Sequence, residues 1–226
     1  MKLGIIIAAS GKGLRISSEV PKQFMFVAGK PLIQWTIQRC MSVTGLYQLV
    51  IVVPEDFRTQ TLALIPSSRV PHINVVTGGR HRTDSVRNGL AVIEPACDYV
   101  AIHDGARPFI KPVDFERCVR AAVHHGSAVA AGPCTDTIKL EHRGFIVKTL
   151  DRTHVWFVQT PQVFTRTGIS AACRKARRKH LTDDAQMFER MGKKVRIVNV
   201  GSYNRKITTR EDFAYAELVL RNTGGQ

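Results

Sequence analysis

Two glycines and two spaced cations mark the first candidate for chemistry, in the stretch AASGKGLRISSEVPKQF at residues 8–24. Gly11 and Gly13 permit unusual backbone angles, so a ligand can approach the main chain and its N–H groups. Arg15 adds a guanidinium fork and Lys22 a point charge, a pair that suits a triphosphate. The stretch is neither a Walker A loop nor GxGxxG. Alone the glycines favour a strand-to-helix turn, whereas the added cations favour a phosphate-binding loop.

A second glycine pair occurs in GGRHRTDSV, residues 78–86. Gly78 and Gly79 allow close backbone approach, and Ser85 places a hydroxyl near an expected helix start. By itself the motif favours a simple turn with a helix cap supplied by Thr83 or Asp84.

Acidic and basic candidates follow later in the chain. In HDGARP, residues 103–108, Asp104 could bind sugar hydroxyls or a divalent metal, and Arg107 could bind phosphate. Asp104 as a helix cap is the competing interpretation. His103 has no metal-spaced partner and is interpreted as a packed residue. Lys206 and Arg152, taken singly, are ambiguous between surface cations and phosphate ligands.

The reaction class follows from which groups occur and which do not. The sequence contains no Ser-His-Asp order, no paired catalytic carboxylates and no Cys-His nucleophile pattern. Basic side chains and glycine loops around phosphate suit transfer of a phosphorus centre, which needs positioning and charge stabilisation more than covalent catalysis.

Composition bounds the class of protein. The 226 residues, 44% of them hydrophobic, predict one domain over 1–226. Five scattered cysteines without zinc spacing predict reduced thiols and a cytoplasmic location. The N-terminal apolar run, about seven residues, suits a buried strand and neither a membrane span nor a signal peptide.

The net charge of +15 makes a nucleic-acid-binding module the alternative from a different class. The charge is mostly dispersed, however, and its densest run, CRKARRKH at 173–180, is interpreted as a solvated helix face. A basic protein also attracts small polyphosphates.

Alternating strands and helices must position these motifs. Strands are expected at 3–9, 47–53, 73–78, 99–104, 127–133 and 194–200, and helices at 31–42, 57–65, 83–93, 112–125, 167–179, 183–191 and 210–222. Trp156, Phe157 and Phe164 are expected in the core. This order predicts an α/β fold with a mostly parallel sheet and helices on both faces. The motifs after the first, third and fourth strands would then share the carboxyl edge of the sheet.

One segment interrupts the alternation. Residues 136–141 and 145–150 flank HRG and predict a β-hairpin with Gly144 in the turn. We call residues 134–152 the arm. The arm either projects and mediates dimerisation or folds back on its own domain, and the residues alone do not separate these alternatives.

Taken together the motifs resemble one family, the 2-C-methyl-D-erythritol 4-phosphate cytidylyltransferases. AASGKGLRISSEVPKQF, GGRHRTDSV, HDGARP, DTIK, QTPQVF, LTDDA and NRKIT occur in that family's order across nearly the whole chain. The resemblance implies a Rossmann-like domain with a projecting β-arm that builds a homodimer. It also implies transfer of a cytidylyl group from CTP to methylerythritol 4-phosphate with Mg²⁺, in isoprenoid precursor synthesis.

The resemblance assigns expected roles residue by residue. Arg15 and Lys22 would stabilise the transition state, and Arg152 and Lys206 would position the attacking phosphate. Asp104, Arg107, Thr160 and Thr182 would hold the methylerythritol portion, while Thr137 and Arg152 would reach the partner subunit's site. The nucleotide would be surrounded by Ala9, Ser10, Gly11, Gly13, Gly79, Arg80 and Ser85. Mg²⁺ would be held mainly by CTP oxygens, with Asp104 as the candidate protein ligand.

The sequence departs from the family's pattern at several positions, and two of them adjoin the expected base site. Ser10 stands where the family usually has alanine, and Arg80 occupies a variable or acidic position. A related enzyme that couples CTP to ribitol 5-phosphate shares the nucleotide loop and remains the alternative activity.

Overall fold

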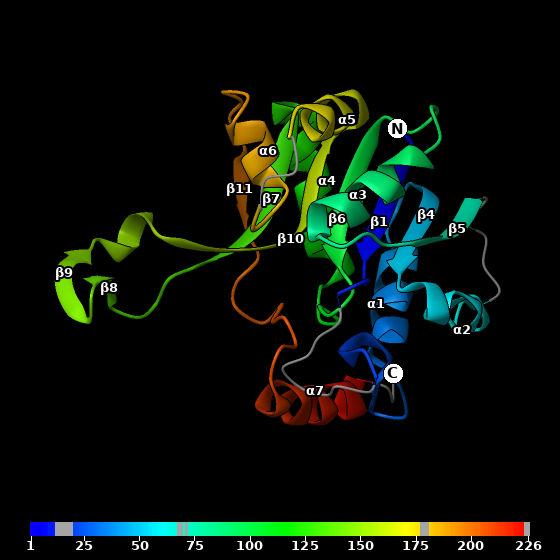
Figure 1. Ribbon diagram of the computed structural model, residues 1–226, viewed down its shortest axis with the longest axis horizontal. Helices are drawn as coiled ribbons and strands as arrows, with labels where there is room; N and C mark the ends of the chain where they lie inside the picture. Colours follow the sequence, from blue (N-terminus) through cyan, green and yellow to red (C-terminus); the bar gives the residue numbers. More distant parts are fainter. Residues whose placement is uncertain (12–19, 67–69, 71, 177–180, 224–226) are drawn as a thin grey trace.

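A seven-stranded sheet forms the centre of the molecule in the computed structural model, which describes residues 1–11, 20–66, 70, 72–176 and 181–223 (Figure 1). Its strand order is β11-β7-β10-β6-β1-β4-β5. The strands are β1 (Leu3–Ala8), β4 (Leu46–Val53), β5 (His72–Thr77), β6 (Tyr99–Asp104), β7 (Ser127–Pro133), β10 (Trp156–Thr165) and β11 (Arg196–Asn199). All six predicted strands are confirmed, and the fold is the predicted α/β class.

The centre of the sheet is parallel because its strands are apolar along both faces. β1 pairs in parallel with β4 and β6, and its residues 3–7 are all buried. A strand that is hydrophobic on every side must be covered on both faces, and this accounts for the unbroken run at the N-terminus.

Helices cover both faces as predicted. The helices are α1 (Leu32–Met41), α2 (Arg58–Ala63), α3 (Arg82–Ala91), α4 (Pro112–His125), α5 (Arg166–Lys175), α6 (Ala185–Glu189) and α7 (Arg210–Thr223). One apolar cluster joins the sheet to α1 and α4, and a second joins it to α3, α5 and α6. A third, smaller cluster packs α7 against Val27, Leu32 and Phe109. α5 includes residues 173–175 of the charged run 173–180, and residues 177–180 of that run lie outside the described residues.

β10 is the strand of the seven-stranded sheet that the sequence interpretation missed. It runs antiparallel to both β6 and β7, so the sheet is mixed rather than wholly parallel. The core assignment holds for Phe164, which is fully buried, and is wrong for Phe157, which is 54% exposed. Phe157 lies where β10 leaves the domain towards the arm, while Phe164 lies between the helices and the sheet.

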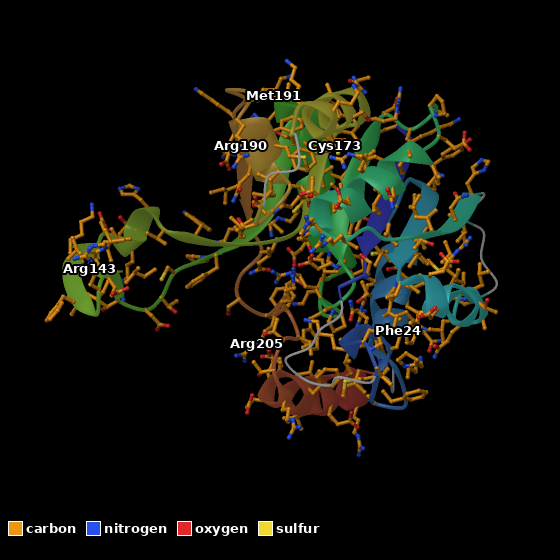
Figure 2. The ribbon with its side chains drawn as sticks, in the orientation of Figure 1. Phe24, Arg143, Cys173, Arg190, Met191 and Arg205 are labelled. Carbon is orange, nitrogen blue, oxygen red and sulfur yellow. The ribbon has the colours of Figure 1, made fainter. Side chains whose placement is uncertain are left out.

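The arm projects away from the sheet (Figure 1). β8 (Ile138–His142) and β9 (Phe145–Leu150) form a separate antiparallel sheet. Gly144 turns the chain with φ +83°, a conformation open to glycine, and Arg143 precedes it at the tip (Figure 2). The folded-back alternative is therefore excluded.

Candidate active site

A cavity of about 510 Å³ lies at the carboxyl edge of the sheet. It is lined by Ala8, Ser10, Gly11, Lys22, Gln23, Gly79, Arg80, His81, Arg82, Ser85, Asp104, Ala106 and Lys206. β1, β5 and β6 all end beside it, because parallel strands share one carboxyl edge. The motifs that follow these strands are thus brought together as predicted.

The first wall is the segment after β1 together with the short 3₁₀ turn Lys22–Phe24. Gln23 Nε2 donates to the carbonyls of Ala9 and Gly11, both at 2.9 Å, and fixes the backbone where β1 opens into the loop. Phe24 stacks on Phe57 at 4.3 Å and anchors the turn. Gln23 was not singled out from the sequence, although it stands inside the PKQF motif.

Lys22 lies almost buried in this wall. Lys22 lines the cavity, and its Nζ donates to the carbonyl of Ile207 at 2.6 Å. Ile207 follows Lys206, so the contact joins the first and last motifs of the chain. Gly13 and Arg15, also predicted for this loop, lie outside the described residues.

The second wall is the start of α3. The Ser85 hydroxyl accepts from the backbone N–H of Gly79 at 3.1 Å and lies 2.7 Å from the Ser10 hydroxyl. A Cβ on Gly78 would lie 2.1 Å from the Cβ of Ser10, and one on Gly79 would lie 2.3 Å from the Cβ of Asp84. These glycines are therefore required by packing within the chain. Arg80 is exposed at the rim of the cavity.

Asp104, at the end of β6, is surrounded by three cations. Its oxygens accept from Lys206 Nζ at 2.9 Å, Arg107 Nε at 3.2 Å and an Arg82 terminal nitrogen at 3.3 Å. Burial would raise the pKa of this carboxyl, but Lys206, Arg82 and Arg107 outweigh burial and hold the pKa well below its ordinary value. Asp104 is ionised at any pH at which the protein is expected to work.

Arg82 is the residue that sequence reasoning missed most clearly. It bridges Asp104 and the buried Asp184, which it contacts at 2.5 Å. Asp184 precedes α6, so Arg82 ties that segment to the cavity. Nothing local in GGRHRTDSV distinguishes this arginine from its neighbours, since both carboxylates come from distant parts of the chain.

A buried hydrogen-bond network of Thr160 and His103 supports the backbone at Asp104. The Thr160 hydroxyl accepts from the Asp104 backbone N–H at 3.0 Å and lies 3.0 Å from His103 Nδ1. His103 Nε2 lies 3.1 Å from the carbonyl of Arg107 and, as a neutral tautomer, donates to it. Burial lowers the pKa of His103 to about 4, so the ring is neutral near pH 7. The packed interpretation of His103 is confirmed, and Thr160 supports the Asp104 backbone.

The remaining predicted residues do not line the cavity within a single chain. Arg107 is nearly buried and donates to Asn204 O at 2.8 Å as well as to Asp104. Thr182 is exposed and accepts from Gln186 Nε2. Thr137 and Arg152 are exposed at the base of the arm, where Arg152 donates to Thr135 O at 2.5 Å. Their predicted roles towards substrate stay predictions.

The described side chains do not offer a ligand set for Mg²⁺. Among these residues no group of three His, Cys, Asp or Glu side chains could hold a metal ion. Both oxygens of Asp104 already accept from three cations, which oppose a further positive charge at the carboxylate. The chain's own residues therefore do not favour Asp104 as a direct ligand.

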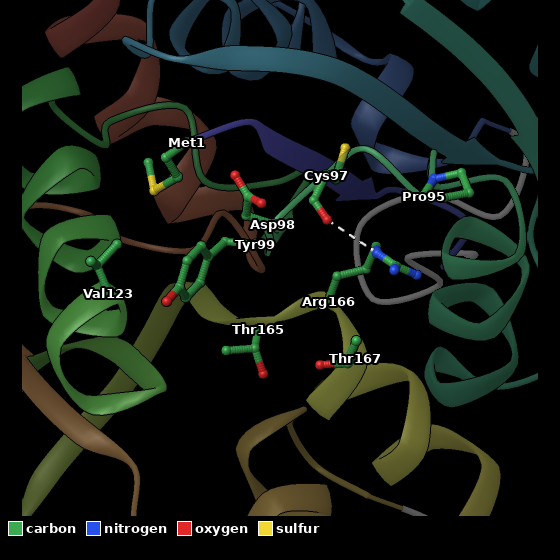
Figure 3. A pocket seen from close by; sticks show the side chains of 9 residues that line it. All are labelled: Met1, Pro95, Cys97, Asp98, Tyr99, Val123, Thr165, Arg166 and Thr167. Carbon is green, nitrogen blue, oxygen red and sulfur yellow. Dashed lines mark hydrogen bonds between the residues drawn. The ribbon is translucent and has the colours of Figure 1, made fainter.

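A second hollow, of about 470 Å³, lies at the opposite edge of the sheet (Figure 3). It adjoins the start of β6 at Tyr99 and the end of β10 at Thr165, and Arg166 Nε donates to the Cys97 carbonyl there at 3.1 Å. Since none of the glycine or cation motifs reaches it, the chemistry is assigned to the carboxyl edge.

Comparison with known proteins gives a consistent result. The family model described as 2-C-methyl-D-erythritol 4-phosphate cytidylyltransferase matches residues 3–222. The chain is 40% identical to a protein of that name from Pelotomaculum thermopropionicum, covering 100% of this chain and 97% of the relative. It is 37% identical to another from Endomicrobium trichonymphae, covering 98% and 100% respectively.

Solved structures agree with the sequence relatives. The crystal structure of 4-diphosphocytidyl-2C-methyl-D-erythritol synthase from Anaerococcus prevotii superposes with a TM-score of 0.86 at 29% identity, covering 97% of this chain and 98% of that one. Family model, sequence relatives and fold all extend over almost the whole length. The chain therefore belongs to the 2-C-methyl-D-erythritol 4-phosphate cytidylyltransferase family.

Proposed function

We propose that this chain transfers the cytidylyl group of CTP to the phosphate of 2-C-methyl-D-erythritol 4-phosphate and releases pyrophosphate, in isoprenoid precursor synthesis. The observation that carries the proposal is the family match over residues 3–222, whose motif residues Lys22, Asp104 and Lys206 meet in one cavity. An anionic nucleotide and an anionic phosphate ester both suit a site with this many cations.

The reaction needs in-line attack on the α-phosphorus and stabilisation of the negative charge that develops on its oxygens. An oxygen of the substrate phosphate attacks the α-phosphorus of CTP, the bond to the β-phosphate oxygen breaks, and pyrophosphate leaves. Negative charge grows on the equatorial and leaving oxygens. Lys22, with Arg15, would donate to these oxygens, and Lys206 would hold the attacking phosphate beside Asp104.

The methylerythritol portion would lie beside Asp104. An ionised carboxylate is an acceptor for sugar-alcohol hydroxyls, and three cations together with Thr160 hold it in place. Arg107 supports the same carboxylate from its nearly buried position. Thr182 would close the substrate site from the segment that Arg82 attaches through Asp184.

The arm supports a homodimer in which each copy completes its neighbour's site. Phe145, Ile146 and Val147 are 76%, 67% and 58% exposed, and such apolar side chains on an extended hairpin favour packing against protein. Thr137 and Arg152 would then reach the partner subunit's cavity.

The proposed activity would use Mg²⁺ and would take place in the cytoplasm. The ion would be held by CTP oxygens, and the chemistry that it would supply is neutralisation of phosphate charge. A cytoplasmic location is supported by five buried cysteines, none of them in a disulfide. Within the described ranges, no helix is long and apolar enough to cross a membrane.

The direct test is pyrophosphate release from CTP with each alcohol phosphate offered separately. We expect turnover with methylerythritol 4-phosphate and little with ribitol 5-phosphate. Turnover of ribitol 5-phosphate alone would assign the chain to the alternative activity. Strong, salt-dependent binding to random DNA without turnover of either substrate would favour the nucleic-acid alternative instead.

Subunit sharing is tested by mixing inactive variants. Lys22→Ala subunits and Arg152→Ala subunits are refolded together, and exchange is verified by differently tagged chains. If the arm completes the neighbouring site, a heterodimer contains one intact site and activity returns. Verified mixing without recovery would show that each chain works with its own Arg152.

A further inference from the structure

Two of the three cations around Asp104 are also held by a second partner. Arg107 donates to the carboxylate through Nε and to the carbonyl of Asn204 through Nη1 at 2.8 Å. Arg82 donates to Asp104 through Nη2 at 3.3 Å and to Asp184 through Nη1 at 2.5 Å. Both guanidinium groups are therefore fixed from two sides.

Lys206 is the third cation, and it is held differently. Among the described residues its side chain has one partner, Asp104, and that side chain is 40% exposed. An ammonium group on a flexible stem can turn towards a phosphate that enters the cavity. When it does so, the carboxylate loses its closest cation, at 2.9 Å, and depends on the two arginines.

Asp184 is anchored to the sheet independently of Arg82. It is 1% exposed, and its backbone N–H and that of Ala185 both donate to Gln162 Oε1 at 2.9 Å. Gln162 is itself 1% exposed and belongs to β10, which lies beside β6, the strand that ends at Asp104. Asp184 thus offers Arg82 a partner with a fixed position relative to Asp104.

The charges in this cluster explain what a second carboxylate does. Three cations and two carboxylates leave one net positive charge. A substrate phosphate carries up to two negative charges and would compete with Asp104 for any guanidinium that is free to move. Because Asp184 occupies one arm of the Arg82 fork, the other arm stays on Asp104.

We propose that Asp184 is a positioning residue for the alcohol substrate: through Arg82 it keeps the Asp104 carboxylate in place when Lys206 turns to the substrate phosphate. Asp104 then still accepts from two arginines and presents its remaining lone pairs to the hydroxyls of the alcohol. Asp184 is too deeply buried to meet the substrate and acts only through Arg82. The inference rests on the proposed function, because it takes the substrate to be the phosphate ester of a polyol.

The test measures pyrophosphate release and compares Asp184→Asn with the parent. We expect KM for methylerythritol 4-phosphate to rise roughly ten- to a hundredfold, the value of one hydrogen bond between charged groups, while KM for CTP changes less than about twofold. Arg82→Lys keeps the charge but loses the fork that bridges two carboxylates, so it should give the same pattern. The matched control Glu189→Gln removes a carboxylate charge from an exposed position of α6 and should change neither KM.

Two further measurements separate positioning from a general loosening of the fold. If Asp184 acts through Asp104, adding Asp184→Asn to Asp104→Asn should raise KM for the alcohol phosphate little further, so the effects should not multiply. Asp184→Glu restores the charge opposite Arg82 and should recover most of the parent KM. Melting temperatures verify that every variant is folded at the assay temperature.

The results that would overturn the inference differ from those that would overturn the proposed function. An equal rise in KM for both substrates, or effects of Asp184→Asn and Asp104→Asn that multiply, would overturn the inference alone. A parent that turns over ribitol 5-phosphate instead would change the proposed function, and KM for that ester then carries the same comparison. A parent that turns over neither ester would overturn both.

Discussion

Replacing Asp104 with asparagine should cost the protein about 3 kcal/mol of unfolding free energy. At an effective dielectric constant of 20, each cation about 3 Å from the carboxylate contributes roughly 5 kcal/mol of attraction. Burial of the charge offsets much of this, and breaking a buried pair by removing one partner typically costs about 3–5 kcal/mol. We take the low value because Asp104 is 6% exposed but the Lys206 side chain is 40% exposed.

Urea unfolding at pH 7, followed by fluorescence, measures the difference directly. For a chain of this size the same loss lowers the melting temperature by about 6 to 12 °C. The matched control is Asp56→Asn, at an exposed position, which should change stability by less than about 0.5 kcal/mol. A loss below about 1 kcal/mol for Asp104→Asn would refute the view that the carboxylate holds the three cations together.

The pH dependence provides a second check on the same residue. The three cations hold the folded-state pKa of Asp104 below its unfolded value, which is about 3.9. The stabilisation is therefore fully present above about pH 4 and is lost as the pH falls further towards the folded-state pKa. The difference in unfolding free energy between the parent protein and Asp104→Asn should stay constant from about pH 8 to pH 5 and become smaller below about pH 4. A gap that widens on acidification would contradict the reasoning.

Three further predictions follow from the same geometry. Lys22→Ala should lower the turnover number for pyrophosphate release by about 10²–10³, as expected for a lost transition-state donor, and an unchanged rate would remove Lys22 from the chemistry. The His103 ring should titrate near pH 4 by NMR, and titration near 6.5 would contradict its burial. Because the folded-state pKa of His103 lies below its unfolded value, this residue should reduce the stability of the fold as the pH falls from about 6.5 towards 4. Phe145→Asp with Ile146→Asp should convert dimers to monomers in sedimentation and reduce activity without lowering the melting temperature of the monomer; persistence of the dimer would show that the arm is not the contact.

The motif residues illustrate what local sequence could predict. Lys22 and Asp104 come from motifs that follow the first and fourth predicted strands, and the alternation of strands and helices was sufficient to place both motifs at one edge of the sheet. The hairpin turn at Gly144 could also be predicted from the sequence, because the left-handed backbone conformation at such a turn favours glycine.

The missed features depend on partners that lie far apart in the chain. β10 begins in exposed residues beside the arm and ends in the core, so neither alternation nor a continuous apolar run marks it. Arg82 pairs with Asp184 across 102 positions, and Ser10 meets Ser85 across 75. Propensity and spacing carry no signal for such contacts.

The sequence by itself determined the fold class, the family and the set of cations and glycines available for phosphate chemistry, since these follow from short-range pattern and from the order of motifs. Only the tertiary structure decided which hydroxyl faces the cavity, which carboxylate is neutralised by three cations and which residues support others from behind. These outcomes depend on burial and on the competition among neighbouring donors and acceptors, and both arise only once the strands have been packed side by side.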